Sequence, residues 1–155
     1  MEFFKNLPNV KYEGRTSQNP LAFHFYNPDE IIGGKTMREQ LRFAMSYWHT
    51  MCAEGVDMFG VGTADKSYGA QNPMEQAKNK AYAAMELMNK LDIDYFCFHD
   101  RDIAPEAATL SETNARLDEI TALLADLMKQ NGKKVLCPRV QAVRQADRLR
   151  RKEER

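Results

Sequence analysis

Two strongly signalled helices that alternate with short apolar segments constrain the fold of this chain more than any other sequence feature. The first helix is predicted to begin at Pro73, with Asn72 as its N-cap and Glu75 completing a capping box. Residues three or four positions apart mark its apolar face: Met74, Ala77, Ala81, Met85 and Met88. This spacing predicts an amphipathic helix that packs on a core.

The second helix carries signals at both ends. Thr109 and Glu112 have the spacing of a capping box, and Asn131–Gly132 has the composition of a left-handed C-terminal cap. The residues expected on its buried side are Leu117, Ile120, Leu124, Leu127 and Met128. We therefore expect one continuous helix between these caps.

Three short apolar segments flank the helices. The continuous run 95–98 is typical of a strand covered on both faces in a parallel sheet. Residues 41–48 are ambiguous, and we favour a strand because the glycine-rich loop 55–69 and then a helix follow them. Val135–Leu136 begins a third strand. This order predicts an α/β fold with a parallel sheet, doubly wound or an eightfold barrel, and the absence of Gly-x-Gly-x-x-Gly disfavours a dinucleotide fold.

The two ends of the chain differ from this middle region, 41–136. Residues 1–40 are interrupted by Pro and Gly too often for long elements, so we expect an irregular arm with a short extended piece at Leu21–Tyr26. Residues 137–155 hold six Arg and one Lys against one Asp and two Glu. We interpret them as a solvated basic tail, the alternative being an Arg patch for phosphates that lacks aromatic residues to stack bases.

Composition argues against several classes of function. The whole chain balances 22 basic against 22 acidic residues, which makes nucleic acid an unexpected partner. It has no apolar run long enough to span a membrane and no signal-peptide pattern. Because Cys52, Cys97 and Cys137 form no Cys-x-x-Cys pair, we predict neither a disulfide framework nor a zinc site and expect a reducing cytoplasm.

His99 and Asp102 are the strongest candidates for catalytic residues. His99 directly follows the apolar run 95–98, and sites in parallel α/β folds lie beyond the carboxyl ends of strands. A carboxylate three residues later can fold back onto the ring Nδ1–H, fix the tautomer and leave Nε2 to move a proton. From the residues alone, a structural and a catalytic role for the pair are about equally supported.

Two aromatic residues are candidate binding groups. Trp48, the only tryptophan, lies near the end of the first predicted strand, and we interpret it as core or pocket wall. His49 would point to the opposite face of that strand, which indicates a structural role. Phe59 lies in the loop Asp57–Thr63, where an exposed phenylalanine is expected to insert into another subunit or a pocket.

Taken together, several segments resemble one known family. They occur in the order Lys11–Gly14, Asn19–Phe23, Leu41–Thr50, Asp57–Thr63 and Phe96–Glu106. From residue 1 to about residue 136, the chain resembles the N-terminal portion of class II xylose isomerase. The resemblance is specific because it depends on all five segments and on their order.

The resemblance implies a TIM barrel built from β/α units, a tetrameric assembly and metal-dependent interconversion of an aldose and a ketose. In that family the histidine matching His99 assists sugar-ring opening, and the aspartate matching Asp102 orients it. The tryptophan matching Trp48 forms part of the hydrophobic wall of the sugar site. The phenylalanine matching Phe59 reaches into the site of a neighbouring subunit.

The resemblance ends near residue 136. The family binds two divalent cations (Mg, Mn or Co) through residues on later strands that have no counterpart here, so we predict no metal ligand in this chain. A partial barrel exposes strand edges and helix faces, which predicts that a homo-oligomer covers or completes it. We therefore expect a truncated isomerase of D-xylose to D-xylulose with weak or no activity. The alternative is a non-catalytic, self-assembling interaction module derived from the isomerase.

Overall fold

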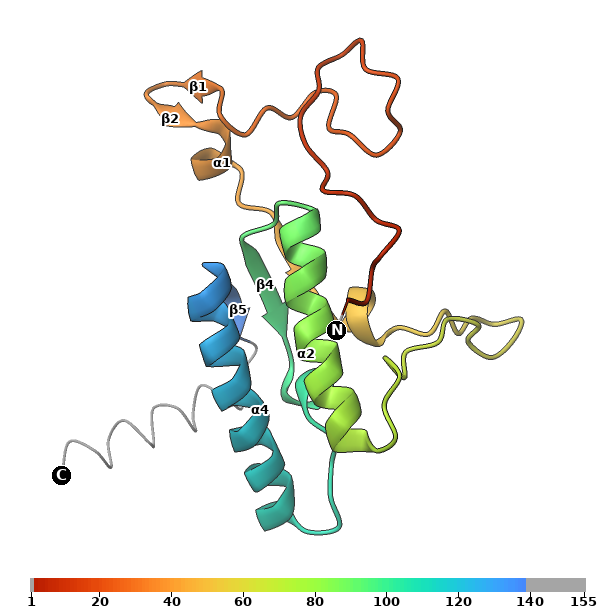
Figure 1. The fold of residues 1–155 in the computed structure, drawn as a ribbon. Helices are drawn as coiled ribbons and strands as arrows, with labels where there is room; N and C mark the ends of the chain where they lie inside the picture. Colours follow the sequence, from red (N-terminus) through yellow and green to blue (C-terminus); the bar gives the residue numbers. More distant parts are fainter. Residues whose placement is uncertain (1, 139–155) are drawn as a thin grey trace, which may run out of the picture.

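The computed structural model describes residues 2–138 (Figure 1), so most of the predicted basic tail lies outside the described residues. No helix in this described part is long and apolar enough to cross a membrane. The elements, in chain order, are β1 (Ile31–Ile32), β2 (Lys35–Thr36), α1 (Met37–Gln40), β3 (Ala44–Ser46), the π-helical turn η1 (Trp48–Cys52), α2 (Pro73–Lys90), β4 (Tyr95–Phe98), α3 (Asp100–Ile103), α4 (Leu110–Asn131) and β5 (Lys134–Pro138).

The central element of the fold is a three-stranded parallel sheet with the order β3–β4–β5. Met45 of β3 pairs with Phe96 of β4, and Phe96 also pairs with Val135 of β5. Helix α2 connects β3 to β4, and α4 follows β4 and leads to β5. The predicted α/β class with a parallel sheet is therefore confirmed. Within residues 2–138 this sheet has three strands and does not close into a barrel.

The two long helices lie side by side on one face of this sheet (Figure 1). Phe96 and Phe98 pack into the core formed with these helices and are buried, whereas Tyr95 and Cys97, which alternate with them along the strand, are half-buried. Both helices cover the same face, so in the described residues the predicted cover is complete on one face of β4 and partial on the other. Complete burial of a side chain such as Phe96 contributes about 2–3 kcal/mol.

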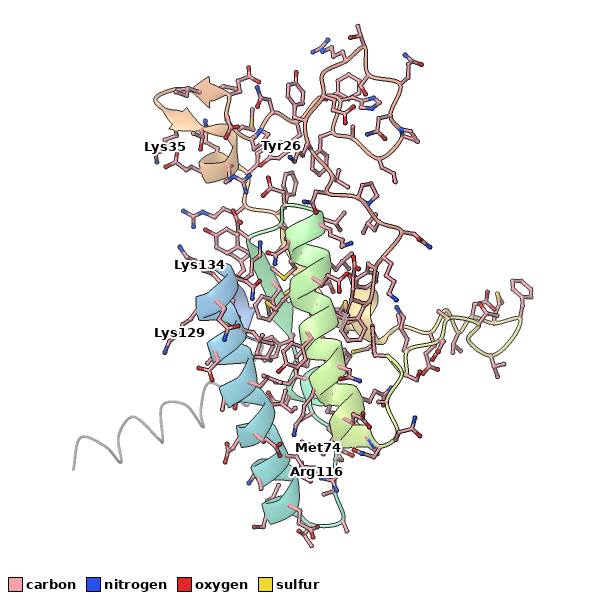
Figure 2. The ribbon with its side chains drawn as sticks, viewed as in Figure 1. Tyr26, Lys35, Met74, Arg116, Lys129 and Lys134 are labelled. Carbon is pink, nitrogen blue, oxygen red and sulfur yellow. The ribbon has the colours of Figure 1, made fainter. Side chains whose placement is uncertain are left out.

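The helix boundaries follow the predicted capping signals. Asn72 Oδ1 accepts the Glu75 backbone N–H at 2.9 Å, but the Glu75 carboxylate accepts from the Gln71 N–H, so the predicted capping box is only half formed. Thr109 and Glu112 form the complete box at the start of α4. Both predicted apolar faces pack on the core, with Met74 (Figure 2) and Met128 half-buried at its edge.

Gly132 ends α4 in the predicted left-handed conformation, at φ 67°. This backbone angle favours glycine because it has no Cβ to clash with the backbone. The chain then turns directly into β5, whose pairing with β4 confirms the predicted third strand.

The apolar stretch that leads to Trp48 forms a shorter strand than predicted. Only Ala44–Ser46 pairs with β4, because the backbone of Tyr47 is already helical and its side chain enters the core. The following residues form η1, closed by a hydrogen bond of 2.9 Å from the Ala53 N–H to the Trp48 carbonyl. Placing Trp48 and His49 on opposite faces of a strand was therefore wrong, since both lie on a helical turn.

The first 40 residues contain little regular structure. The hairpin β1–β2 and the short helix α1 lie near their end, and the extended piece predicted at Leu21–Tyr26 is reduced to one bridge between Phe23 and Tyr12. Glu86 of α2 accepts the backbone N–H groups of Phe3 and Phe4 at 2.7 and 2.8 Å. These bonds attach the start of the arm to α2.

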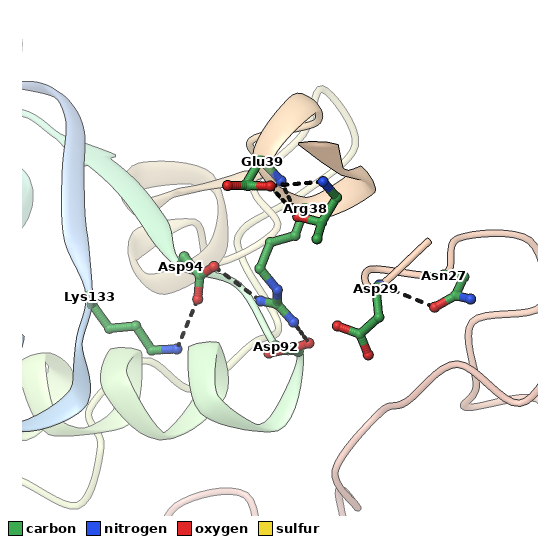
Figure 3. A network of polar contacts seen from close by, with 8 residues as sticks. Asn27, Asp29, Arg38, Glu39, Asp92, Asp94 and Lys133 are labelled. Carbon is green, nitrogen blue, oxygen red and sulfur yellow. Dashed lines mark hydrogen bonds and ion pairs between the residues drawn. The ribbon is translucent and has the colours of Figure 1, made fainter. Parts of the chain in front are cut away.

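Arg38 attaches the other end of the arm to the sheet (Figure 3). Its guanidinium forms an ion pair with Asp92 and donates to Asp94 Oδ2 at 3.0 Å. Lys133 Nζ lies 3.9 Å from the other oxygen of Asp94. Because the two aspartates precede β4 and Lys133 precedes β5, this network lies at the amino ends of the strands.

Candidate active site

The candidate residues His99 and Trp48 meet at the carboxyl ends of two neighbouring strands. His99 directly follows β4, and Trp48 begins η1 two positions after the end of β3. Parallel strands end at the same edge of a sheet, so groups that follow them come together in space. The two ring centroids lie 4.5 Å apart, with 43° between the ring planes. The indole therefore forms one wall beside the imidazole.

Asp102 folds back onto His99 through the single turn of α3. Its Oδ2 lies 2.9 Å from His99 Nδ1 and accepts the His99 backbone N–H at 2.7 Å. Because a carboxylate oxygen accepts and does not donate, we assign the ring proton to Nδ1, which leaves Nε2 as an acceptor. The predicted contact between these side chains is confirmed, while its catalytic role remains a prediction.

The His99 side chain is more exposed to solvent than the Asp102 side chain. The Asp102 side chain is 14% exposed, and the His99 side chain is 42% exposed. The carboxylate is thus shielded behind the ring, and the imidazole is the group that a ligand would reach. This arrangement is typical of a general base whose orientation is set by a buried acid.

The turn that carries Trp48 is anchored from the loop that follows it. Lys66 Nζ donates to the Thr50 carbonyl at 3.0 Å, and the Tyr68 hydroxyl donates to the Met51 carbonyl at 2.7 Å. Burial raises the pKa of Tyr68, so its hydroxyl keeps the proton that it donates. Two of the carbonyl groups in η1 are thereby satisfied by side chains, which fixes the position of Trp48.

A polar cluster behind the two rings was not predicted from the sequence. Cys52 Sγ donates to the Asp102 carbonyl at 3.4 Å, and Lys80 Nζ donates to Cys52 Sγ at 3.4 Å. Lys80 also lies over the ring of buried Tyr47, 5.8 Å from its centroid. The available sequence signal was weak: Lys80 lies beside Ala81 near the buried face of α2, where a charged residue is unusual.

Phe59 is not part of this constellation within one chain. It is 88% exposed and lies in the segment between η1 and α2, which projects from the body of the fold (Figure 1). The Asp57 side chain accepts the Phe59 N–H at 2.8 Å and stabilises a tight turn there. The predicted exposure of Phe59 is confirmed, and its insertion into a second subunit remains a prediction.

The described residues do not fit a divalent cation. Over residues 2–138, no three side chains of the His, Cys, Asp and Glu types come together as a ligand group. Divalent cations such as Mg²⁺ and Mn²⁺ need several convergent oxygen or nitrogen donors. No step through a metal is therefore assigned to these residues.

The fold and the pair together define part of a parallel α/β protein in which His99, Asp102 and Trp48 follow the carboxyl ends of neighbouring strands, where sites in such folds usually lie. No protein-family model matches the chain. Individual curated proteins do match it. Over 137 residues, the chain is 55% identical to the xylose isomerase of Thermoanaerobacter sp. (strain X514). Over 136 residues, it is 48% identical to the xylose isomerase of Bacillus subtilis (strain 168).

These alignments cover 88% of this chain and about 31% of each relative. The Geobacillus kaustophilus (strain HTA426) xylose isomerase is 51% identical over the same shares. The resemblance to xylose isomerase is therefore confirmed along almost all of this chain, which spans about a third of the length of these curated relatives.

Proposed function

We propose that this chain carries the ring-opening part of a xylose isomerase site, in which His99 moves a proton on a cyclic aldose. The observation that supports this most directly is the 2.9 Å contact between His99 Nδ1 and Asp102 Oδ2 at the carboxyl end of β4. The identity of about half of the residues with proteins named xylose isomerase supports D-xylose as the sugar and D-xylulose as the product.

The proposed proton transfer follows from the assigned tautomer. Neutral His99 accepts the proton of the anomeric hydroxyl at Nε2 and delivers a proton to the ring oxygen. The bond from the anomeric carbon to the ring oxygen breaks, the anomeric carbon becomes a carbonyl, and the imidazole is regenerated. Asp102 keeps the second ring proton on Nδ1 throughout and stabilises the transient imidazolium.

Trp48 is proposed to form the apolar wall of the sugar site. Its ring is half-buried and lies against His99, so its position is coupled to that of the base. The C–H faces of a pyranose pack well on an indole, whereas its hydroxyls need polar partners. Phe59 is proposed to contribute a second apolar contact from a neighbouring copy in a homo-oligomer.

Isomerisation beyond ring opening is expected to be weak or absent in residues 2–138 on their own. In the full-length isomerases a divalent metal, Mg, Mn or Co, supports the later step, and the described residues bring together no group that would bind one. The activity of the whole isomerase is thus proposed only for a protein that also supplies those ligands.

An exchange experiment on D-xylose tests this proposal. NMR exchange spectroscopy measures interconversion of the α and β anomers, which requires ring opening but no ketose formation. We expect the chain to accelerate the exchange and His99→Ala to reduce the acceleration about 100-fold or more. His49→Ala is the matched control, because it removes an exposed imidazole from the neighbouring turn.

Two results would contradict parts of the proposal. If the unmodified chain and His99→Ala accelerate anomer exchange equally, His99 is not the base. If the purified chain converts xylose to xylulose at a substantial rate with added Mg²⁺, Mn²⁺ or Co²⁺, the expectation of weak isomerisation is wrong.

A non-catalytic, self-associating module is the second candidate function. Large apolar side chains are strongly exposed in the loop that contains Phe59: Val56, Met58, Phe59 and Val61. Together with the half-covered face of the sheet, they favour contact with further copies of the chain. Light scattering tests this reading: we expect an oligomer that Phe59→Ser weakens, and a stable monomer at micromolar concentration would exclude it.

A further inference from the structure

One thiol joins the turn that carries Trp48 to the turn that carries Asp102. Cys52 is the last residue of η1, and Asp102 lies in α3. In the sequence, α2 and β4 separate the two. Cys52 Sγ donates to the Asp102 backbone carbonyl at 3.4 Å, within the usual range for a sulfur donor. The two halves of the candidate site are therefore connected by a hydrogen bond as well as by the contact between their rings.

The surroundings of Cys52 keep it in the form that can donate. The side chain is half-buried, and this burial raises the pKa of the thiol, although the nearby Lys80 ammonium acts in the opposite direction. Cys52 therefore keeps its proton at neutral pH, as a donor to a carbonyl must. Lys80 Nζ donates to the sulfur at 3.4 Å and so fixes the thiol from the side of α2.

Other side chains hold η1 in place but do not reach α3. Lys66 and Tyr68 bind carbonyls of the turn, and they are themselves held by α2, where Gln76 donates to the Lys66 carbonyl and Asn79 to the Tyr68 carbonyl. These bonds position Trp48 relative to α2. The hydrogen bond from Cys52 instead connects η1 to Asp102 in α3, the residue that orients the His99 imidazole.

We propose that Cys52 is a positioning residue of this site, whose thiol holds the α3 turn so that Asp102 meets His99 Nδ1. The inference deepens the proposed function and takes the role of His99 from it. Cys52 touches neither the sugar nor the imidazole, and acts only through Asp102. Lys80 supports it by fixing the sulfur between α2 and α3.

The competing explanation is that Cys52 only fills space, as a small apolar residue would. Cys97 provides a matched control for this explanation. It is also half-buried, and its Sγ donates to a backbone carbonyl, that of Met45, at 3.7 Å. Cys97→Ala therefore removes a comparable thiol from β4 and leaves the bond from Cys52 to α3 in place.

The test measures the tautomer of His99 by NMR of the full chain labelled with ¹⁵N-histidine. Cys52→Ala is expected to lower the ratio of Nδ1–H to Nε2–H tautomers at least about twofold, because even a weak hydrogen bond shifts a local equilibrium by that factor. Cys52→Ser, which retains a donor, is expected to restore most of the ratio, and Cys97→Ala to leave it unchanged. Equal ratios in Cys52→Ala and Cys97→Ala, or a folded Cys52→Ser that matches Cys52→Ala, would overturn the proposal.

The unmodified chain gives a second measurement that does not depend on a variant folding. Exchange of the thiol proton for deuterium is expected to shift the ¹³C resonance of the Asp102 carbonyl, because that carbonyl accepts from the thiol. The neighbouring Ile103 amide also exchanges and shifts this resonance, so the test is the additional shift from the thiol, and its absence would refute the hydrogen bond. Neither measurement uses sugar, so a failure of the ring-opening assay would count against the proposed function and leave the positioning role to be judged separately.

Discussion

The two ends of the three-stranded sheet use polar side chains in opposite ways. At the amino ends, Arg38 binds Asp92 and Asp94, and Lys133 lies beside Asp94, so the charges are paired with one another. At the carboxyl ends, within residues 2–138, the His99 ring binds Asp102 through Nδ1 and presents the rest of its ring beside Trp48. The amino end is thus built for attachment of the arm, and the carboxyl end keeps a titratable group available to a ligand.

Electrostatics at the amino end supports this distinction. Hydrogen bonds that Arg38 donates to Asp92 and Asp94 raise its pKa against the opposing effect of burial, so its charge is stabilised in the folded chain. Burial lowers the pKa of Lys133, and the nearby aspartates only partly offset this. Arg38, Asp92 and Asp94 therefore form a favourable network. Burial of the charged Lys133 beside them is unfavourable.

Asp102→Asn is expected to have the largest effect, and it acts at the carboxyl end. An amide no longer fixes the Nδ1–H tautomer, so the rate of anomer exchange on D-xylose should fall about 100-fold. The free energy of unfolding should fall by only about 1 kcal/mol, the net value of a hydrogen bond, because the His99 N–H keeps an amide oxygen to donate to. Exchange NMR and urea denaturation measure the two quantities, and a loss of stability without a loss of rate would reverse the assignment of this end.

Arg38→Met is expected to show the opposite pattern. It leaves Asp92 and Asp94 without their main partner and loosens the arm, so unfolding should become easier by about 1–2 kcal/mol, above the value of an exposed pair because the network is partly shielded. The rate of anomer exchange per folded molecule should stay unchanged. Lys35→Met, on the same arm and exposed (Figure 2), is the control that removes a charge outside the network. A rate that falls with Arg38→Met would mean that the two ends are coupled.

The two ends also differ in how far the sequence predicts them. The contact of Asp102 with His99 was predicted because both residues belong to one turn, where a spacing of three positions decides the geometry. Both long helices were predicted for the same reason, since their caps at Asn72, Thr109 and Gly132 are local signals. Local chemistry therefore accounts for the two long helices and for half of the candidate site.

Contacts between distant segments could not be predicted in this way. Cys52 and Asp102 are 50 positions apart, and Arg38 and Asp92 are 54 positions apart, so nothing in either local sequence identifies the partner. The turn η1 was missed because an apolar run does not distinguish a strand from a helix, and the sheet alone decides where pairing stops. The contact of Trp48 with His99 was not predicted, although each residue was placed near the end of a predicted strand.

Lys133→Met is the smallest of these effects and tests the unfavourable member of the amino-end network. The Lys133 side chain is 7% exposed, and its ammonium lies 3.9 Å from Asp94 Oδ1, beyond a normal hydrogen bond. Replacing it with an apolar chain of similar length should raise the free energy of unfolding by about 0.5–1 kcal/mol at pH 7. Loss of stability instead would show that the ion pair outweighs the cost of burial.

The pH dependence of this variant follows from the lowered pKa of Lys133. Between that lowered pKa and the ordinary lysine value, the unfolded chain binds more protons than the folded chain, so the stability of the unmodified protein rises with pH in this window. The advantage of Lys133→Met should therefore be complete below the window and disappear above it, where the lysine is neutral in both states. Lys134→Met, at the exposed neighbouring position (Figure 2), should show no such dependence in urea denaturation at increasing alkaline pH. If the gain in the free energy of unfolding stays constant across this pH window, the effect is due to packing and not to the charge of Lys133.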